Sequence, residues 1–599
     1  MQIQLQHARQ KDNEASLLWP RERLTPGEGV RVVHYDPQGA KIVLTAPRGE
    51  MSAYSGDPFA AFIAVFPEKV IPRPLLRPEW FAPRDNEDGT ATFMPYGIRK
   101  IEALLLNAGI PREDIACCHP DNLERFVGPK TRIVGITSMD PMGLAYVSVT
   151  YSSMIAVPGE TADAREFRRV MENPVFQKYD PTIIVGGAGA WQIRHAGMVE
   201  KWGIDVLMHG EGELTVVDLF RRALAGETLD REVHGSKVPI EFIPTIRNGA
   251  SYGVVEITRG CGRGCQFCSP TNRRRHSLPL DHIMKEVATN VAAGSNEVFC
   301  ATEDLFLYEC GSRFEPNPAA LEKLFTTIGR HPGVDYVHLS HIAIAPVVYD
   351  PTAVERISPI LLEKTRYTPA FRPHYKEPFV TALFGIESGS IRIMKKYMRG
   401  KIWPYPIEQY HEVNVQGLGI LNDNHWRPMA TLITGWPDET PDDTVQTLEL
   451  LDKMKGFNVF FVPLMFIPLE DTKLRNERRV SLELMTPEQW DVFATAWRMN
   501  IDNWAPHQQP LFTFAALFAY YAYFRWKHGK KVFAPIMKIA RFPSFATLPP
   551  KFPLKTDGGI DPQYCREDAR TIARDQIRTL PVLQEIQATP PERTAPPTP

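Results

Sequence analysis

Short apolar runs alternate with amphipathic stretches of helical spacing over the first third of the chain. Runs rich in Val, Ile and Leu predict buried strands, and the apolar spacing of residues 98–109 predicts a helix. Five strands are expected, at residues 41–47, 114–118, 132–138, 182–190 and 205–213. Strands that alternate with helices are typical of βαβ units, so we expect a parallel α/β domain over residues 41–235.

A second alternation follows an irregular stretch at residues 236–253, which is expected to be a linker. Six further strands are predicted, at residues 254–261, 296–304, 334–341, 380–390, 429–440 and 458–464. Helical segments at residues 281–294 and 442–456 separate some of them. This order predicts a complete or partial (β/α) barrel over residues 250–475, whose strand-end loops carry the chemistry.

The chain turns helical after about residue 471, so residues 476–585 are expected to form a helical C-terminal domain. Trp490, Trp497 and Trp504 recur every seven residues and should form a packing stripe on one helix face. The aromatic, apolar stretch at residues 511–524 is too short to span a membrane.

The two ends of the chain differ in composition from the rest. Residues 1–40 are mixed and polar and are expected to be an extension, and the proline- and threonine-rich residues 586–599 are expected to be a disordered tail. The N-terminus lacks the features of a secretory signal, and no stretch reaches about 18 apolar residues, so a cytoplasmic location is expected.

Charge and cysteine content limit the partners and the kinds of site that the chain is expected to have. The formal net charge of −2 gives no field that would hold a polyanion, so no nucleic-acid partner is expected. The basic run at residues 272–276 is expected to be a solvated or ion-paired face. Eight cysteines in 599 residues are too sparse for a disulfide scaffold. Three of them lie within eight positions, which indicates a metal site.

These three cysteines, Cys261, Cys265 and Cys268, have the spacing C-x3-C-x2-C directly after a predicted strand. Three thiolates this close can hold one face of a cubane cluster and leave one iron without a protein ligand. Structural zinc normally takes four ligands as two separated pairs, and the chain has no second C-x-x-C pair. We therefore expect a [4Fe–4S] cluster rather than zinc or inert buried thiols.

The segment resembles the signature of the radical S-adenosylmethionine (SAM) superfamily, C-x3-C-x-Φ-C, with Phe267 at the aromatic position. The resemblance, which covers about residues 250–475, implies that SAM chelates the open iron. One electron then cleaves SAM to methionine and a 5′-deoxyadenosyl radical. An external electron donor of the flavodoxin or ferredoxin type is implied as a partner.

Further segments match the family in the expected order, and they imply the residues that contact SAM. Segment 299–306 follows the second barrel strand, segment 385–390 ends the fourth, and segment 435–440 resembles the G-x-P-x-E-T turn after the fifth. The residues implied in contact with SAM are Glu303, Asp304, Glu387, Ser388, Gly435, Pro437 and Phe267. Taken singly, each carboxylate could instead be a helix N-cap or a solvated loop residue.

A parallel α/β domain directly before the barrel is similar to the cobalamin-binding class of the superfamily, which implies a Rossmann-like cobalamin-binding-type domain. The residues that would meet cobalamin at the strand ends are Ser138, Gly186, Gly187, Gly210 and Glu211. The D-x-H-x-x-G motif of many cobalamin proteins is absent, so the lower face of the cobalt is expected to be open or bound to water. The alternative is a domain that is only structural.

The expected reaction is a cobalamin-dependent methylation of an unactivated carbon in a small hydrophobic substrate such as a lipid, isoprenoid or tetrapyrrole. The apolar stretch at residues 511–524 and the basic cluster after it suit contact with a membrane surface or an apolar tunnel, and a core helix is the alternative. Two other reactions stay open: carbon–carbon bond formation or ring closure without methyl transfer, and a non-catalytic iron–sulfur sensor or electron carrier. Methylthiotransferases that modify tRNA share the barrel. The chain lacks their extra amino-terminal cysteine set and their basic C-terminal module, so they rank lower.

Overall fold

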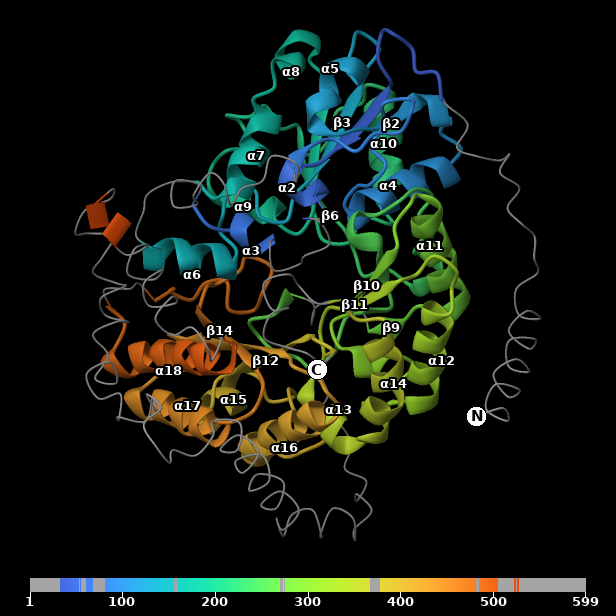
Figure 1. Cartoon of the computed structure of the whole chain (residues 1–599). Helices are drawn as coiled ribbons and strands as arrows, with labels where there is room; N and C mark the ends of the chain where they lie inside the picture. Colours follow the sequence, from blue (N-terminus) through green and yellow to red (C-terminus); the bar gives the residue numbers. More distant parts are fainter. Residues whose placement is uncertain are drawn as a thin grey trace, which may run out of the picture.

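The computed structural model describes most of the chain in two linked α/β units (Figure 1). The described residues are 33–52, 54, 61–67, 81–155, 160–269, 273, 275–366, 378–480, 484–504, 522–523 and 525–526. The expected tail at 586–599, most of the extension at 1–40 and nearly all of 511–524 lie outside them.

Fourteen strands are assigned within the described residues. They are β1 Ile42–Thr45, β2 Ile115–Cys117, β3 Ile133–Thr137, β4 Thr182–Gly186, β5 Val206–His209, β6 Glu232–His234, β7 Val254–Glu256, β8 Thr258–Arg259, β9 His276–Ser277, β10 Glu297–Ala301, β11 Tyr336–Leu339, β12 Leu383–Glu387, β13 Met429–Thr434 and β14 Phe460–Met465. The α-helices are α2 Arg48–Met51, α3 Ala61–Ala64, α4 Tyr96–Asn107, α5 Leu123–Phe126, α6 Tyr146–Ile155, α7 Ala162–Met171, α8 Pro174–Tyr179, α9 Ala190–His195, α10 Val216–Leu224, α11 Leu280–Ala292, α12 Pro318–Gly329, α13 Ile344–Tyr349, α14 Thr352–Glu363, α15 Ile391–Tyr397, α16 Tyr410–Asp423, α17 Pro441–Lys453 and α18 Pro487–Trp504.

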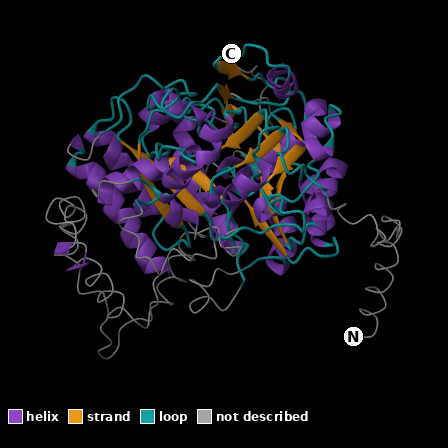
Figure 2. Ribbon diagram, turned by 90° about the horizontal axis from the view of Figure 1, so that it is seen from above, coloured by secondary structure: helices purple, strands orange, loops and turns teal. Residues whose placement is uncertain are grey.

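The first unit is a parallel sheet with the order β2-β1-β3-β4-β5-β6. Successive side chains of β1 enter different cores: Val43 packs with α5, α7, α8 and α9, whereas Ile42 and Leu44 pack with α4 and α10. Helices therefore cover both faces of this sheet. Figure 2 shows helices on both sides of the strands in the molecule as a whole. The five predicted strands are present, and β6 is a sixth that the pattern did not predict.

The second unit contains two parallel three-stranded sheets, with the orders β7-β10-β11 and β12-β13-β14. A parallel bridge between His341 and Leu383 joins them into one six-stranded series, which contains the six predicted strands in chain order. Residues 236–253 between the units hold only two short 3-10 turns apart from irregular chain.

The two units meet over buried polar contacts. From α4, the Lys100 Nζ lies 2.6 Å from Glu286 Oε1 on α11, and the Tyr96 hydroxyl donates to Glu286 Oε2 at 2.7 Å. A second contact is made by α6, which leaves the first unit and lies against β14 and α18 (Figure 1). The strand-end loops of the first unit are thereby brought to the second.

The C-terminal part is described mainly by α18. Trp490 is buried beside Phe493, and Trp497 lies edge-on to Tyr151 of α6 and to Phe460 of β14. The expected packing stripe is thus present at these two tryptophans. No helix within the described ranges is long and apolar enough to cross a membrane.

Candidate functional site

The three cysteines lie on a loop between the paired strands β8 and β9, after the end of β7. Cys265 is buried, and Cys261 and Cys268 are partly buried. Glycines at 260, 262 and 264 all have positive φ, of 70°, 72° and 77°. Residues with a side chain rarely adopt this conformation, so Gly260 lets the chain turn before Cys261, and Gly262 and Gly264 let it turn between Cys261 and Cys265.

The thiols lie in one low-dielectric region. Burial raises the pKa of Cys265 to about 11 and also raises the pKa of Cys261 and of Cys268. The neighbouring thiols raise the pKa of Cys268 further, and Lys401 lowers it. The three thiols and the Lys401 ammonium group therefore lie near one another.

The loop is held by segments distant in sequence. The Gln266 amide donates to the Tyr397 carbonyl at 2.9 Å, and the Lys473 amide donates to the Gln266 carbonyl at 3.0 Å. The buried Arg263 guanidinium donates to Asp304 Oδ2 at 3.1 Å and to the carbonyl of Trp403 at 3.2 Å. The sulfur geometry is therefore fixed by the folded barrel.

The geometry bears on which metal group fits. Among the residues that the structure describes, no three His, Cys, Asp or Glu side chains are close enough to hold a single metal ion. A cubane cluster places its three thiolates on three different irons, so its ligands stand farther apart than those of a single ion. The three cysteines of the loop match in number and residue type the protein ligands of such a cluster.

Glu387 has unusual backbone geometry at the end of β12. Its φ is +65°, and the register of β12 against β13 shifts between Gly385 and Glu387. Its Oε1 accepts from Lys401 Nζ at 3.0 Å and its Oε2 accepts from the Thr431 hydroxyl at 3.1 Å. Burial alone would lower the pKa of Lys401, but Glu387 and the Cys265 thiol raise it above its usual value. Strain of this kind concentrates at functional sites, where surrounding contacts maintain it.

Two of the predicted SAM contacts have structural partners. Asp304 Oδ1 accepts from the amides of Phe306 and Ala343, and its Oδ2 accepts from Arg263, so it caps the 3-10 turn Leu305–Leu307. Ser388 is fully buried, and its hydroxyl accepts from the Ser390 amide at 3.1 Å. Their role toward SAM stays a prediction.

Glu303, by contrast, faces the cysteine loop, and its carboxylate accepts fewer side-chain and backbone hydrogen bonds than that of Asp304. Its Oε1 lies 3.4 Å from Arg273 Nη1, and burial raises its pKa to about 6. Cys261 is close enough for Glu303 to raise the pKa of the thiol. Glu303 and Glu387 thus approach the cysteine loop from the ends of β10 and β12.

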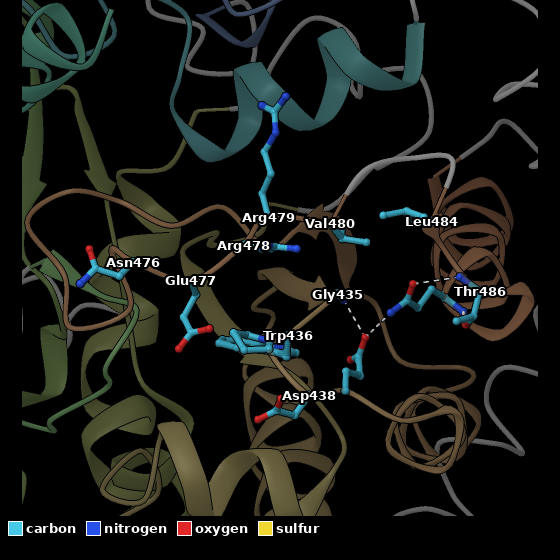
Figure 3. Close-up of a pocket in the computed structure, with 13 residues that line it drawn as sticks. Gly435, Trp436, Asp438, Asn476, Glu477, Arg478, Arg479, Val480, Leu484 and Thr486 are labelled. Atoms are coloured by element: carbon cyan, nitrogen blue, oxygen red, sulfur yellow. Dashed lines mark hydrogen bonds between the residues drawn. The ribbon is translucent and has the colours of Figure 1, made fainter.

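Gly435 and Pro437 line a pocket of about 560 Å³ at the end of β13 (Figure 3). A Cβ at Gly435, whose φ is +79°, would lie 2.4 Å from Val480 Cγ1, so only glycine fits there. The Gly435 amide donates to Glu439 Oε2 at 2.7 Å, and burial raises the pKa of Glu439 to about 7. The rim includes Arg478, which extends toward Val480 in Figure 3.

Phe267 joins this pocket to the cysteine loop. Its ring is buried and packs edge-on to Trp436, with 5.2 Å between the ring centroids. Trp436 in turn stacks on Tyr397 at 5.8 Å. This aromatic cluster packs at the end of the loop that carries Cys268.

Strand ends of the first unit carry the residues predicted to meet cobalamin. Ser138 is buried, and its hydroxyl donates to Glu50 Oε1 at 2.7 Å. Gly187 is exposed with a φ of +95°, and a Cβ there would lie 2.5 Å from the Ser138 carbonyl oxygen. Gly186 lies beside it at the end of β4. The glycines leave an open backbone edge that fits a large planar ligand, whereas the Ser138 hydroxyl is occupied.

The loop after β5 points toward the second unit. Gly210 is exposed with a φ of +79°, but Glu211 Oε2 accepts from the Val238 amide at 2.8 Å and Oε1 lies 3.8 Å from Arg259 Nη1. Arg259 also donates to Glu213 Oε1 at 2.7 Å, and it donates to both carboxylate oxygens of Glu256. Gly210 fits a ligand edge, whereas Glu211 faces the strand that leads into the cysteine loop.

The described residues of the basic run and the other described cysteines have ordinary surroundings, and Cys565 lies outside the described residues. Arg273 pairs with Glu303, and the Arg275 guanidinium lies over the Phe314 ring at 4.5 Å. Cys117, Cys118 and Cys300 are buried free thiols, and Cys310 is partly buried. Residues 272 and 274 of the basic run lie outside the described part.

No family model matches the chain. Among curated proteins it is similar to tRNA-2-methylthio-N(6)-dimethylallyladenosine synthases. That of Marinomonas sp. (strain MWYL1) is 26% identical over 37% of this chain and 44% of its own length. Synthase 1 of Mycobacterium marinum is 26% identical over 63% of this chain and 67% of its own length. The chain spans about half the length of the first curated relatives it matches. These relatives belong to the class of tRNA-modifying enzymes that the sequence analysis ranked lower.

The relatives and the cysteine loop at the end of a parallel strand point to one superfamily. The chain resembles the radical SAM enzymes. Among solved structures, the radical SAM methyltransferase TsrM from Kitasatospora setae with cobalamin and a [4Fe–4S] cluster bound has a TM-score of 0.47 at 12% identity, covering 73% of this chain and 74% of that one.

The sequence analysis did not predict three residues of this site. Lys401 lies 14 positions after its partner Glu387, and Arg263 sits between two cysteines without any motif of its own. Tyr146 comes from the other unit, and its hydroxyl donates to the Phe267 carbonyl at 2.9 Å. Only Arg263 carried a signal, namely its place inside the cysteine motif.

Proposed function

We propose that this protein binds a [4Fe–4S] cluster at Cys261, Cys265 and Cys268, and that it cleaves SAM reductively there. The observation that carries the proposal is the cysteine loop at the end of the parallel strands, with Glu303 and Glu387 facing it. When bound, the cluster supplies the electron that breaks the sulfonium bond.

The chain's own residues bind and orient the reactants. The Lys401 and Glu387 pair supplies a fixed cation and a fixed acceptor beside the loop, and Glu303 offers an acceptor for an ammonium group. Gly435 lets the backbone line the adjoining pocket, where a nucleoside can lie against Trp436. Phe267 and Trp436 keep water away from the radical.

We propose further that the first unit binds cobalamin and that the reaction is methylation of an unactivated carbon. Support comes from the exposed backbone edges at Gly187 and Gly210, at the carboxyl ends of neighbouring parallel strands. Ligands of open α/β sheets bind at such edges. The hydrophobic substrate, the flavodoxin- or ferredoxin-type donor and membrane contact remain part of this proposal.

Anaerobic reconstitution with iron and sulfide tests the cluster. The wild type should take up about four irons per chain and form 5′-deoxyadenosine from SAM after reduction. Cys265→Ser should lose both, whereas Cys310→Ser should keep both. A sample that binds zinc, or binds iron without splitting SAM, would overturn the proposal. Loss of the cluster in Cys310→Ser would favour the electron carrier with a fourth protein ligand.

Methyl transfer has its own readout. S-adenosylhomocysteine formed together with 5′-deoxyadenosine, and a cobalamin spectrum retained after gel filtration, are expected. Deoxyadenosine alone would favour carbon–carbon bond formation or ring closure instead.

A second candidate is methylthiolation of tRNA, which the curated relatives favour. Those relatives are named for 2-methylthio-N(6)-dimethylallyladenosine, so tRNA that carries N(6)-dimethylallyladenosine but no methylthio group should be offered as substrate and its nucleosides analysed by mass spectrometry. A gain of one sulfur and one methyl group on adenosine would replace the small-molecule proposal.

A further inference from the structure

The cysteine loop is held at both ends by the first α/β unit. Arg259, two residues before Cys261, is bound by Glu213 from the loop after β5. Phe267, directly before Cys268, is bound through its carbonyl by Tyr146 at the start of α6. The loop after β5 and the start of α6, both in the first unit, thus contact the cysteine loop of the second unit.

The position of Tyr146 is itself well fixed. Asp140 Oδ1 accepts from the Ala145 amide at 3.0 Å, and its Oδ2 accepts from the Ser148 hydroxyl, so this carboxylate anchors the first turn of α6. Farther along the helix, the Thr150 hydroxyl accepts from the Met465 amide of β14 at 3.0 Å. The helix therefore brings the Tyr146 hydroxyl to its acceptor without freedom to swing away.

The hydrogen bond acts on the peptide that precedes a cluster ligand. The Phe267 carbonyl belongs to the same peptide group as the Cys268 amide, so its orientation sets the direction of the Cys268 side chain. Within the described residues, Tyr146 supplies the donor that this carbonyl receives. Removing the donor leaves a largely buried carbonyl unsatisfied and frees the peptide to rotate.

We propose that Tyr146 is a positioning residue for the cluster: it fixes the Phe267–Cys268 peptide, so that the first unit completes the cluster site of the second. The inference rests on the proposed cluster at the three cysteines. It assigns to the first unit a part in holding that cluster, independent of whether cobalamin binds.

Tyr146→Phe removes only the hydroxyl, and Tyr151→Phe is its matched control. Tyr151 lies on the same helix, and its hydroxyl also donates to a backbone carbonyl, that of Pro463 at 3.5 Å, on β14 rather than the cysteine loop. Both variants are reconstituted anaerobically in the full chain. Their thermal midpoints, rates of iron loss to a chelator, and electron paramagnetic resonance spectra after reduction are compared with those of the wild type.

Tyr146→Phe is expected to lose iron about ten-fold faster than the wild type and to show a shifted resonance spectrum, since a lost buried hydrogen bond corresponds to about one order of magnitude. Tyr151→Phe should match the wild type in both. A wild-type spectrum and iron-loss rate in Tyr146→Phe, or equal changes in both variants, would overturn the positioning role alone. A wild type that takes up no cluster would instead refute the proposed function.

Discussion

Glu50 is a partly buried acidic residue on α2, next to the edge where a ligand is proposed to bind. It accepts from the Ser138 hydroxyl and from the Met139 amide, both at 2.7 Å. Burial raises its pKa to about 7 and the nearby Asp140 raises it further, although the two hydrogen bonds lower it. Asp163, whose own pKa burial also raises, adds another acidic group to this region.

A raised pKa makes the stability of the fold depend on pH. Between its ordinary pKa of 4.5 and the folded value of about 7, the folded chain keeps a proton on Glu50 that the unfolded chain releases. The free energy of unfolding should therefore fall as pH rises through this window. Glu50→Gln keeps an acceptor and removes the titration, so the variant should lose this part of the decline. Denaturant unfolding of both proteins at pH 5 and pH 8 measures it, and parallel curves would contradict the assignment.

At the level of single residues, the sequence predicted the site residues that form a short motif. The three cysteines and Phe267 could be identified because their signal lies within eight positions. The partners of these residues could not, since Lys401 and Arg259 act through contacts that only the folded chain creates. For the same reason no spacing revealed that Glu211 turns toward Arg259.

Helix α6 is one of the elements through which the two units share hydrogen bonds. Its Thr150 is fully buried, and the hydroxyl accepts the Met465 amide of β14 at 3.0 Å. Thr150→Val keeps the shape of the side chain but leaves that buried amide without an acceptor.

Thr150→Val is expected to lower the free energy of unfolding by about 1–3 kcal/mol, the penalty for an unsatisfied buried group. Thr289→Val is the control, because the Thr289 hydroxyl donates to the Lys285 carbonyl on an exposed helix face. The control should change stability by less than about 0.5 kcal/mol. Equal effects in chemical denaturation would show that the contact between α6 and β14 adds nothing.

At the level of elements, buried parallel strands were predicted well because continuous apolar runs mark them. The exceptions are β6, whose first two residues are partly exposed and whose last is exposed, and the two-residue strand β9. Their existence depends on neighbours rather than on an apolar pattern. The role of α6 was missed because its interface involves polar groups, which give no periodic signal.

On the scale of the whole molecule, the buried pair of Lys100 and Glu286 joins the two units. Lys100 is 4% exposed and Glu286 is fully buried. Glu286 also accepts from the Tyr96 hydroxyl and from the Ile246 amide. Lys100→Met would leave the buried Glu286 carboxylate without its lysine, with the His282 Nε2 at 3.3 Å as the remaining basic group.

Lys100→Met is expected to cost about 3–5 kcal/mol, as breaking a buried pair from one side does. Lys285→Met, which removes an exposed partner of Asp281 on the same helix as Glu286, should cost less than about 1 kcal/mol. Calorimetry of the two variants compares them, and similar thermal midpoints would show that this pair does not hold the units together. Sequence could predict the two units but not this interface, because its residues are 186 positions apart.

The hairpin that carries the cysteines bears on whether the cluster is inserted before or after the barrel has been synthesised and folded. Only two residue pairs join β8 to β9, so the loop has little local structure of its own. Its shape comes from Tyr397, Trp403 and Lys473, which the ribosome makes more than a hundred residues after Cys268. Metal loading should therefore follow release of the finished barrel, and a fragment ending before residue 396 should retain no iron.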